Sequence, residues 1–301
     1  MKKSNTRICF IVNPVADRKR SARYIDWIKN ESKKRWNYYE INITQKNQNV
    51  SGLAKSKSQT FDVIVACGGD GTVNQVVNGI VGTGTTLGVL PIGSGNDFVK
   101  SLKLPDSLPE CFELLYLEHS VLIDLIRYTG DVKGWSANTM GIGLDGLANF
   151  YAGSYKLLRG HLIYIMGALK AAFKFRGAEI KLDVDGKKLD GNYLMVTACN
   201  GKWEGGNFHL VPEAELTDGV LHLFTIKKIP LPTILAYLPA LRYGPSPGMK
   251  GLNTVKAGRV KLKSKTGLSV HNDGEHLGES IKDLEIEIRK KVLSVITVVN
   301  Y

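Results

Sequence analysis

Residues 62–100 read DVIVACGGDGTVNQVVNGIVGTGTTLGVLPIGSGNDFVK, and this stretch decides the fold of the first part of the chain. The run from Asp62 to Cys67 is short, apolar and rich in β-forming residues, which is typical of a buried parallel strand. It stops at the glycine-rich run GGDGT, residues 68–72, and apolar residues then recur at 73, 76, 77 and 80. The pattern predicts a strand, a tight turn and a helix that begins at or just after Thr72, whose hydroxyl would cap it.

The glycine-rich turn has the composition of an anion-binding site. Glycines let the backbone take positive φ and let an anion approach the amides without meeting a Cβ. Unpaired N–H groups and the helix dipole then favour a phosphate. An ordinary turn with flexible glycines is the alternative, although GGDGT after a strand is more specific than an isolated G-x-G. The run lacks the Gly-Lys-Ser/Thr of a P-loop and the third glycine of the dinucleotide fingerprint.

A second turn of the same kind follows the next predicted strand, Leu87 to Leu90. It reads PIGSGNDF over residues 91–98, and Asn96 and Asp97 open another helix, for which either could be a cap. Turns that follow neighbouring parallel strands lie together at the carboxyl edge of the sheet, where open α/β sheets bind ligands. The pair of turns therefore predicts a nucleotide site.

Three motifs carry a family resemblance: GGDGTVNQVVNG at 68–79, LGVLPIGSGNDF at 87–98 and HNDGE at 271–275. In this order and over nearly the whole chain, they resemble the diacylglycerol kinase catalytic-domain family, which includes bacterial lipid kinases and is related to sphingosine kinases. The resemblance implies an ATP- and Mg²⁺-dependent lipid kinase that transfers the γ-phosphate to the hydroxyl of a lipid alcohol. Diacylglycerol, giving phosphatidic acid, is the first-choice acceptor, and a phosphatidylglycerol or sphingoid-type alcohol stays open.

The same resemblance implies the residues of the site. Gln75 stands where the family usually has Glu, and Ser94 where it usually has Thr. The implied nucleotide-binding residues are Asn13, Thr44, Gly68, Gly69, Asp70, Gly71, Thr72, Val73, Asn74, Ser94 and Asn96. In HNDGE, Glu275 is the implied general base, with Asp273 beside it, and a plain Asp-Gly turn is the structural alternative.

Two magnesium arrangements are implied. Asp70, Asp97 and Asp124 would form a water-mediated network around Mg²⁺, which takes oxygen ligands and keeps several waters. A structural Mg²⁺ would be held by the Asp218 carboxylate and the carbonyls of Glu215 and Val220, whereas the residues alone favour an Asp-Gly turn leading into a strand. A histidine metal site is a weak reading, because the six histidines include no H-x-x-x-H helix.

The predicted pattern of secondary structure changes after residue 126. Before it, strands at 8–12, 38–44 and 121–126 alternate with helices from about 19 to 36 and 107 to 117; beyond it, strands flank turns such as Asp185-Gly186. We predict an α/β nucleotide-binding domain over 1–126 with a parallel sheet, an antiparallel β-sandwich with a helical insert over 127–290, and a segment, 291–301, that could pack back on the first domain. The apolar helix at 162–175 either faces lipid or, as is commoner, packs on its own β domain.

Composition limits the partners. The 301 residues are 43% hydrophobic and carry a net charge of +12, which suits a nucleotide, a nucleic acid or acidic lipid headgroups. The motifs of nucleic-acid binders are missing, and the four cysteines are scattered among apolar runs, as in a reduced intracellular protein. We expect a cytoplasmic protein, peripheral at the inner face of an anionic membrane, with a homodimer left open.

Two alternative functions remain at this point. An NAD kinase-like enzyme also carries GGDGT, although the GSGNDF turn and the late DGE favour the lipid branch. A non-catalytic protein that binds nucleotide or acidic membranes is suggested by Gln75, by the altered turn NPVAD at 13–17 and by the basic charge.

Overall fold

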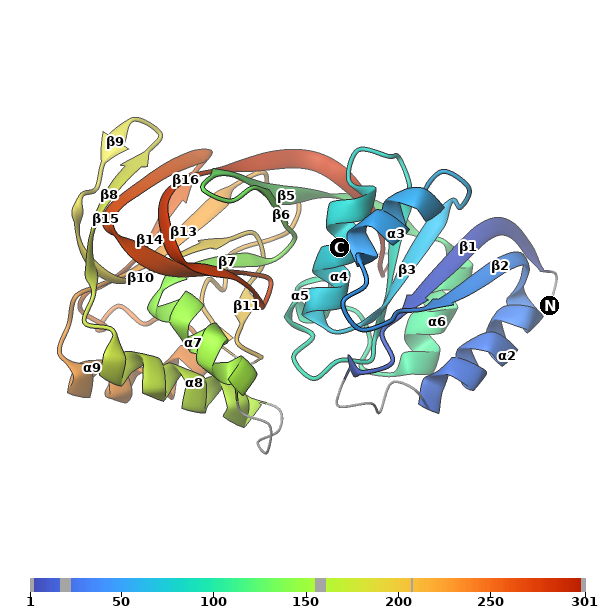
Figure 1. Cartoon of the computed structure of the whole chain (residues 1–301), viewed down its shortest axis with the longest axis horizontal. Helices are drawn as coiled ribbons and strands as arrows, with labels where there is room; N and C mark the ends of the chain where they lie inside the picture. Colours follow the sequence, from blue (N-terminus) through green and yellow to red (C-terminus); the bar gives the residue numbers. More distant parts are fainter. Residues whose placement is uncertain (1–2, 17–22, 155–160, 207, 299–301) are drawn as a thin grey trace. The chain divides into compact units, whose positions relative to one another are not determined.

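The computed structural model describes residues 3–16, 23–154, 161–206 and 208–298, with only the backbone at 154 and 161–164. The chain divides into two compact units, Met1–Ile123 with Lys291–Tyr301, and Asp124–Lys290. The first is α/β and the second is mostly antiparallel β, which confirms the predicted fold class (Figure 1).

A parallel sheet forms the centre of the first unit. Its strands are β1 (Ser4–Val12), β2 (Trp36–Ile43), β3 (Val63–Gly68) and β4 (Thr86–Pro91), in the order β4-β3-β1-β2. The carboxyl ends coincide, because Val12 lies opposite both Ile43 and Cys67, and Gly68 lies opposite Pro91. The last residues of β16 (Glu275–Ile296) add to this sheet, with Val295 beside Leu87. The glycine turns therefore leave one common edge of the sheet.

Within the described part of this unit, the sheet is accompanied by α2 (Ile25–Arg35), α3 (Val50–Lys57), α4 (Asp70–Ile80), α5 (Asp97–Ser101) and α6 (Leu108–Leu117). An aromatic core lies under α2 and α6, where Phe10 stacks on Phe112 at 5.7 Å and the edge of Trp36 meets both rings. Burying each such ring stabilises the unit by about 1.5–3 kcal/mol. This core fixes the strands that carry the two turns.

The start of one helix differs from the prediction. Helix α4 begins at Asp70, with Gly69 as its N-cap and no side-chain cap, so Thr72 lies inside the first turn. The Thr72 hydroxyl instead accepts a hydrogen bond from Asn13. The predicted start of the first helix, near residue 19, lies outside the described residues, and α2 is described from Ile25 to Arg35.

The second unit is built on antiparallel strands in the order β14-β13-β10-β7-β15-β16. Apolar residues alternate with exposed ones, as in β8, where AEIKLDV buries every second side chain against the core. The predicted hairpin at Asp185-Gly186 is confirmed, with φ of +49° and +84° between β8 and β9. The described strands of the second unit, together with β16, are β5 (Ser120–Gly130), β6 (Gly134–Ser136), β7 (Thr139–Gly143), β8 (Ala178–Val184), β9 (Lys187–Lys188), β10 (Gly191–Cys199), β11 (Trp203–Glu204), β12 (Phe208–His209), β13 (Leu221–Lys227), β14 (Leu252–Ala257) and β15 (Arg259–Asn272).

Helices cover part of this β structure: α7 (Leu144–Ser154), α8 (His161–Lys174), α9 (Leu231–Tyr237) and a 3₁₀ turn, η2 (Ala240–Arg242). Helix α8 packs against α7 and α9, as Figure 1 shows. Among the described residues, no helix is long and apolar enough to cross a membrane.

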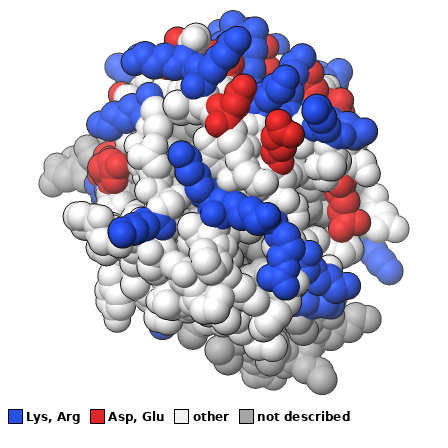
Figure 2. Space-filling view, turned by 90° about the vertical axis from the view of Figure 1, so that its left-hand side faces the viewer, with Lys and Arg blue, Asp and Glu red and all other residues white. Residues whose placement is uncertain are grey.

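One face of the molecule is strongly basic. On β15, Arg259, Lys261, Lys263 and Lys265 are exposed, and Lys187 and Lys188 are exposed on β9. Figure 2 shows Lys and Arg side chains gathered over this side, with fewer acidic side chains among them. The excess of positive charge found in the composition is therefore concentrated partly on the second unit.

Candidate functional site

The two glycine turns of the first unit touch backbone to backbone. A Cβ added at Gly93 would lie 2.2 Å from the Cα of Gly69, and one added at Gly68 would lie 2.3 Å from the Thr72 hydroxyl oxygen. Close approach therefore requires these glycines. Positive φ, which glycine allows, is not used in this turn: Gly69 has φ −97°, and neither Gly68 nor Gly71 has a positive φ.

The predicted nucleotide residues of the first unit lie along this edge. Asn13 follows β1 and its side-chain amide donates to the Thr72 hydroxyl at 3.1 Å, while Thr44 follows β2 and its N–H donates to Val12 O at 2.9 Å. The first turn of α4 leaves N–H groups without intrahelical acceptors at this same edge. The structure thus brings Asn13, Thr44 and the turn at 68–72 together, which is the arrangement that a phosphate-bearing ligand requires.

Val73 and Asn74 lie in the first turns of α4. Val73 is buried in the core, so any contact it makes with a nucleotide would come from the main chain. The Asn74 side chain accepts a hydrogen bond from Asn78 at 3.3 Å.

The second turn contributes Ser94 and Asn96. Ser94 is exposed, whereas Asn96 takes a left-handed conformation with φ +54°. The Asn96 amide donates to Gly93 O at 3.1 Å, and its Oδ1 is buried without a hydrogen-bond partner among the described residues. A buried acceptor of this kind is costly unless something bonds to it.

The predicted magnesium network involves both units. In the first, the Asp70 carboxylate accepts from Phe98 N–H at 3.1 Å, which ties the two turns together, and Asp97 pairs with Lys100 at 3.1 Å. In the second, Asp124 is buried and accepts from Gly219 N–H at 2.6 Å. The gathering of all three carboxylates around an ion stays a prediction.

Asp218 lies on a tight turn with its two predicted co-ligands. Its carboxylate accepts from Val220 N–H at 2.8 Å, from Glu215 N–H at 3.2 Å and from His222 Nε2 at 2.9 Å. Burial raises the pKa of this carboxyl, but these hydrogen bonds outweigh it and hold the pKa below its usual value. The turn thus already satisfies Asp218, and its role as a magnesium ligand stays a prediction.

The HNDGE segment forms the tight turn between β15 and β16. Asp273 and Gly274 have φ of +46° and +84°. The Asp273 carboxylate is buried and accepts from Ser136 OH at 2.7 Å and from the N–H groups of Ala137, Asn138 and Thr139 at 2.8, 2.9 and 2.9 Å. Asp273 therefore anchors the turn, and its catalytic role stays a prediction.

Glu275 differs from its neighbour. It is exposed and its carboxylate accepts no hydrogen bond from the described part of the chain. Nevertheless the surrounding protein raises the pKa of Glu275 by displacing water, so the side chain is open to solvent but not fully hydrated. An open carboxylate with a raised pKa is suited to accept a proton.

An apolar pocket lies within the second unit, and sequence reasoning did not find it. It contains about 750 Å³ of empty space, part of it open to solvent. Its wall is mainly apolar, with residues from α7, α8, β10, β13, α9 and η2, such as Leu144, Ala168, Met195, Ile226 and Leu241. Its polar members are few and lie on α7 and β11: Asp145, Asn149 and Glu204.

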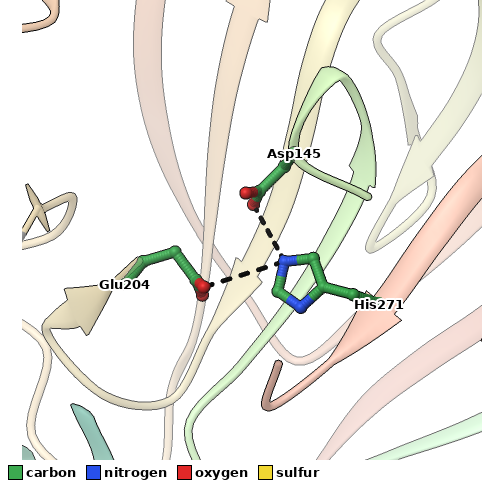
Figure 3. Close-up of side chains that lie close together, drawn as sticks. All are labelled: Asp145, Glu204 and His271. Atoms are coloured by element: carbon green, nitrogen blue, oxygen red, sulfur yellow. Dashed lines mark ion pairs between the residues drawn. The ribbon is translucent and has the colours of Figure 1, made fainter. Parts of the chain in front are cut away.

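Behind Asp145 and Glu204 lies the fully buried His271 (Figure 3). His271 Nε2 is 3.3 Å from Asp145 Oδ2 and 3.8 Å from Glu204 Oε1. Burial lowers the pKa of His271, but the two carboxylates outweigh it and raise the pKa to about 9. The Thr197 hydroxyl donates to Asp145 at 2.8 Å, and the Thr139 hydroxyl donates to Glu204.

These three side chains could hold a metal ion by distance, since the ligand atoms lie within 4.8 Å of one another. However, His271 Nδ1 accepts from Gly274 N–H at 3.4 Å, so a neutral ring carries its proton on Nε2. Coordination through Nε2 would require that contact to be lost. The geometry favours an ion-paired cluster over a metal centre.

Comparisons with known proteins agree with both halves of this description. Residues 7–128 match the family model of the diacylglycerol kinase catalytic domain, and residues 138–297 match that of the YegS C-terminal NAD kinase beta sandwich-like domain. A diacylglycerol kinase of Bacillus subtilis is 30% identical over 224 residues, 72% of each chain. One from Staphylococcus saprophyticus is 25% identical and covers 75% of this chain and 74% of that protein.

Solved structures share the fold. A diacylglycerol kinase from Bacillus anthracis has a TM-score of 0.74 at 20% identity, with 99% of both chains covered. An NAD kinase from Archaeoglobus fulgidus in complex with ATP has a TM-score of 0.52 at 12% identity, covering 96% of this chain and 93% of that one. At these identities the likeness concerns the fold alone.

Proposed function

Because the chain belongs to the diacylglycerol kinase family and is a lipid kinase, we propose that it transfers the γ-phosphate of ATP to the hydroxyl of diacylglycerol, giving phosphatidic acid. The observation that carries this proposal is the apolar pocket of the second unit. A phosphate acceptor such as NAD is polar throughout, whereas an acyl chain gains free energy from an apolar wall, about 0.8 kcal/mol for each CH₂ buried. The pocket therefore supports a lipid acceptor.

The first unit would bind the nucleotide. The main-chain N–H groups of the turn at 68–72 and the N-terminus of α4 are suited to the phosphates, and the unsatisfied Asn96 Oδ1 can accept a hydrogen bond from the ligand. Asp70 and Asp97 offer the oxygen ligands that Mg²⁺ prefers. When bound, Mg²⁺ would neutralise charge on the β and γ oxygens of ATP.

The second unit would supply the acceptor and the base. Glu275 would take the proton from the lipid hydroxyl late in the transfer, when the γ-phosphoryl group is already loosening from ADP. Its raised pKa matches this task, because a carboxylate with a higher proton affinity is a better base. Asp273 would hold the turn on which Glu275 sits.

Helix α8 suits a peripheral contact with an anionic membrane at the inner face. It exposes Met166 and Phe173, and Lys170 and Lys174 are exposed on the same helix. Apolar side chains flanked by lysines insert into the lipid headgroup region while the ammonium groups meet anionic lipid. The basic face in Figure 2 adds attraction over a longer range.

A phosphorylation screen of a total lipid extract tests the proposal. The purified protein is incubated with the extract, Mg²⁺ and γ-labelled ATP, and labelled lipids are separated and identified. We expect label in phosphatidic acid. Labelling of a different lipid would replace diacylglycerol as the acceptor, and no labelled lipid together with normal ATP binding would contradict the proposed function.

A further inference from the structure

Gly274, the residue before Glu275, is held from two sides. Its N–H lies 3.4 Å from His271 Nδ1 and donates to it when the ring is neutral, and its carbonyl accepts from the Asn149 side-chain amide at 2.9 Å. That carbonyl belongs to the peptide bond that joins Gly274 to Glu275. A shift of either partner therefore changes the direction in which Glu275 leaves the turn.

Both partners are connected to the wall of the apolar pocket. Asn149 lines the pocket from α7. His271 does not line the pocket, but its Nε2 faces Asp145 and Glu204, the two carboxylates that do. The packing is tight, since a Cβ added at Gly141 would lie 2.1 Å from Asp145 Oδ2 and 2.2 Å from His271 Nε2. A displacement of the pocket wall can therefore be passed on to the turn.

The other side of the turn cannot move with the pocket. Four hydrogen bonds to the segment 136–139 fix the Asp273 carboxylate, so the part of the turn that can follow the pocket wall begins at Gly274. Glycine is suited to this place because it keeps φ +84° without strain. The turn is thus clamped at Asp273 and adjustable at Gly274.

We propose that His271 and Asn149 are positioning residues that orient Glu275 in response to the lipid in the apolar pocket. This inference rests on the proposed function and goes beyond it. It makes the rate of phosphate transfer depend on how well the acyl chains fill the apolar pocket. Glu275, the proposed base, does not itself line that pocket. Catalysis loses about 10²-fold for a misplacement of 1 Å, so a small rotation at Gly274 is enough.

Asn149→Ala is the first test, with Asn253→Ala, exposed on β14, as the matched control. Turnover is measured with 1,2-dioleoylglycerol and 1,2-dioctanoylglycerol in the same mixed micelles. In the native protein and in the control, we expect a higher kcat for the dioleoyl lipid. In Asn149→Ala, kcat for the dioleoyl lipid should fall about tenfold towards the dioctanoyl value, with the KM for ATP unchanged. A variant that keeps the native ratio of the two kcat values would overturn the proposal.

His271 is tested by two substitutions that each keep one of its contacts. The amide oxygen of Asn in His271→Asn stands near the position of Nδ1 and can accept from Gly274, whereas the longer Gln in His271→Gln can donate to the carboxylates but not accept from Gly274. The native protein and both variants are assayed above pH 9, where the native ring is neutral and accepts from Gly274. Both variants should lower kcat about tenfold and leave the KM for ATP unchanged, because the link needs both contacts. Native kcat in either variant would overturn it.

The buried position of His271 makes folding a necessary check, so melting temperatures accompany these assays. Should the His271 variants not fold, the half-buried Asn149 decides the question alone. Failure of the proposed function is distinguishable: the native protein would then phosphorylate neither diacylglycerol, which overturns both proposals, whereas native turnover with a chain-length ratio unchanged in Asn149→Ala overturns this one only.

Discussion

The glycine turns of the first unit and the apolar pocket of the second differ in how the chain builds them. Each turn is a short contiguous run that follows one strand, and its glycines are required by contacts between backbones. The pocket instead collects side chains from Leu144 to Leu241, none of which forms a motif. The comparison teaches that the proposed phosphate-binding part of this enzyme is encoded locally, while the proposed acceptor pocket is encoded by packing.

Removing the base should have the largest effect. In Glu275→Gln the amide keeps the size of the side chain but cannot take a proton, so kcat should fall by roughly 10² to 10⁴. ATP affinity, measured by calorimetry, should not change, because the nucleotide residues lie in the other unit. Turnover close to the native rate would assign the base elsewhere. The raised pKa of Glu275 also predicts that the acid limb of the kcat profile lies above the ordinary value for a glutamate.

A substitution that separates the two glycine turns tests the proposed phosphate site of the first unit. Gly93→Val would place its Cβ about 2.2 Å from the Cα of Gly69, so the turns must separate. We expect ATP affinity to fall more than about tenfold, with a destabilisation of about 1–3 kcal/mol. Gly248→Val is the control, since nothing lies within 4 Å of its Cβ. Unchanged ATP binding in Gly93→Val would mean that the turns do not bind the phosphates.

A larger side chain in the apolar pocket tests whether the second unit binds the lipid there. Ala168→Phe adds a ring at a half-buried position of α8 that lines the pocket. The KM for 1,2-dioleoylglycerol should rise about tenfold, since loss of roughly 1.4 kcal/mol of binding corresponds to that factor, and ATP affinity should stay native. Ala236→Phe, on the exposed side of α9, is the matched substitution that should leave the lipid KM as it is. An equal effect of both variants would speak against lipid binding in this pocket.

The smallest effect concerns pH and the stability of the second unit. His271 has a pKa raised from 6.5 to about 9 in the folded protein, so the unfolded chain releases this proton first as the pH rises. The stabilisation of the folded protein by protonated His271 is complete below pH 6.5 and is lost between pH 6.5 and 9. The melting temperature of the native protein should therefore fall over this range more steeply than that of His271→Asn. Parallel curves would show that the carboxylates do not hold a proton on His271.

The features that could be predicted from the sequence are those encoded by residues close together in the chain. The strand, turn and helix at 62–80 and the hairpin at Asp185-Gly186 depend on neighbours in the chain, and the structure contains them. The helix start was placed two residues late because the Thr72 hydroxyl bonds to Asn13, 59 positions away. A capping rule considers only nearby backbone groups and cannot include such a partner.

The rest of the site depends on contacts between distant strands. His271 meets Asp145 and Glu204 only because β15 lies next to β7, and Glu204 lies on the short strand β11. No spacing in the sequence connects Asp145 with His271 or Glu204. For the same reason the anchoring of Asp273 by residues 136–139 could not be read from HNDGE.

The central claim is that a lipid alcohol, held by the second unit, accepts the phosphate of ATP bound by the first. Its most direct test supplies γ-labelled ATP and Mg²⁺ to the native protein with 1,2-dioleoylglycerol in one reaction and NAD in a parallel one. We predict labelled phosphatidic acid in the first and no labelled NADP in the second. Label in NADP alone, with none in phosphatidic acid, would contradict the account.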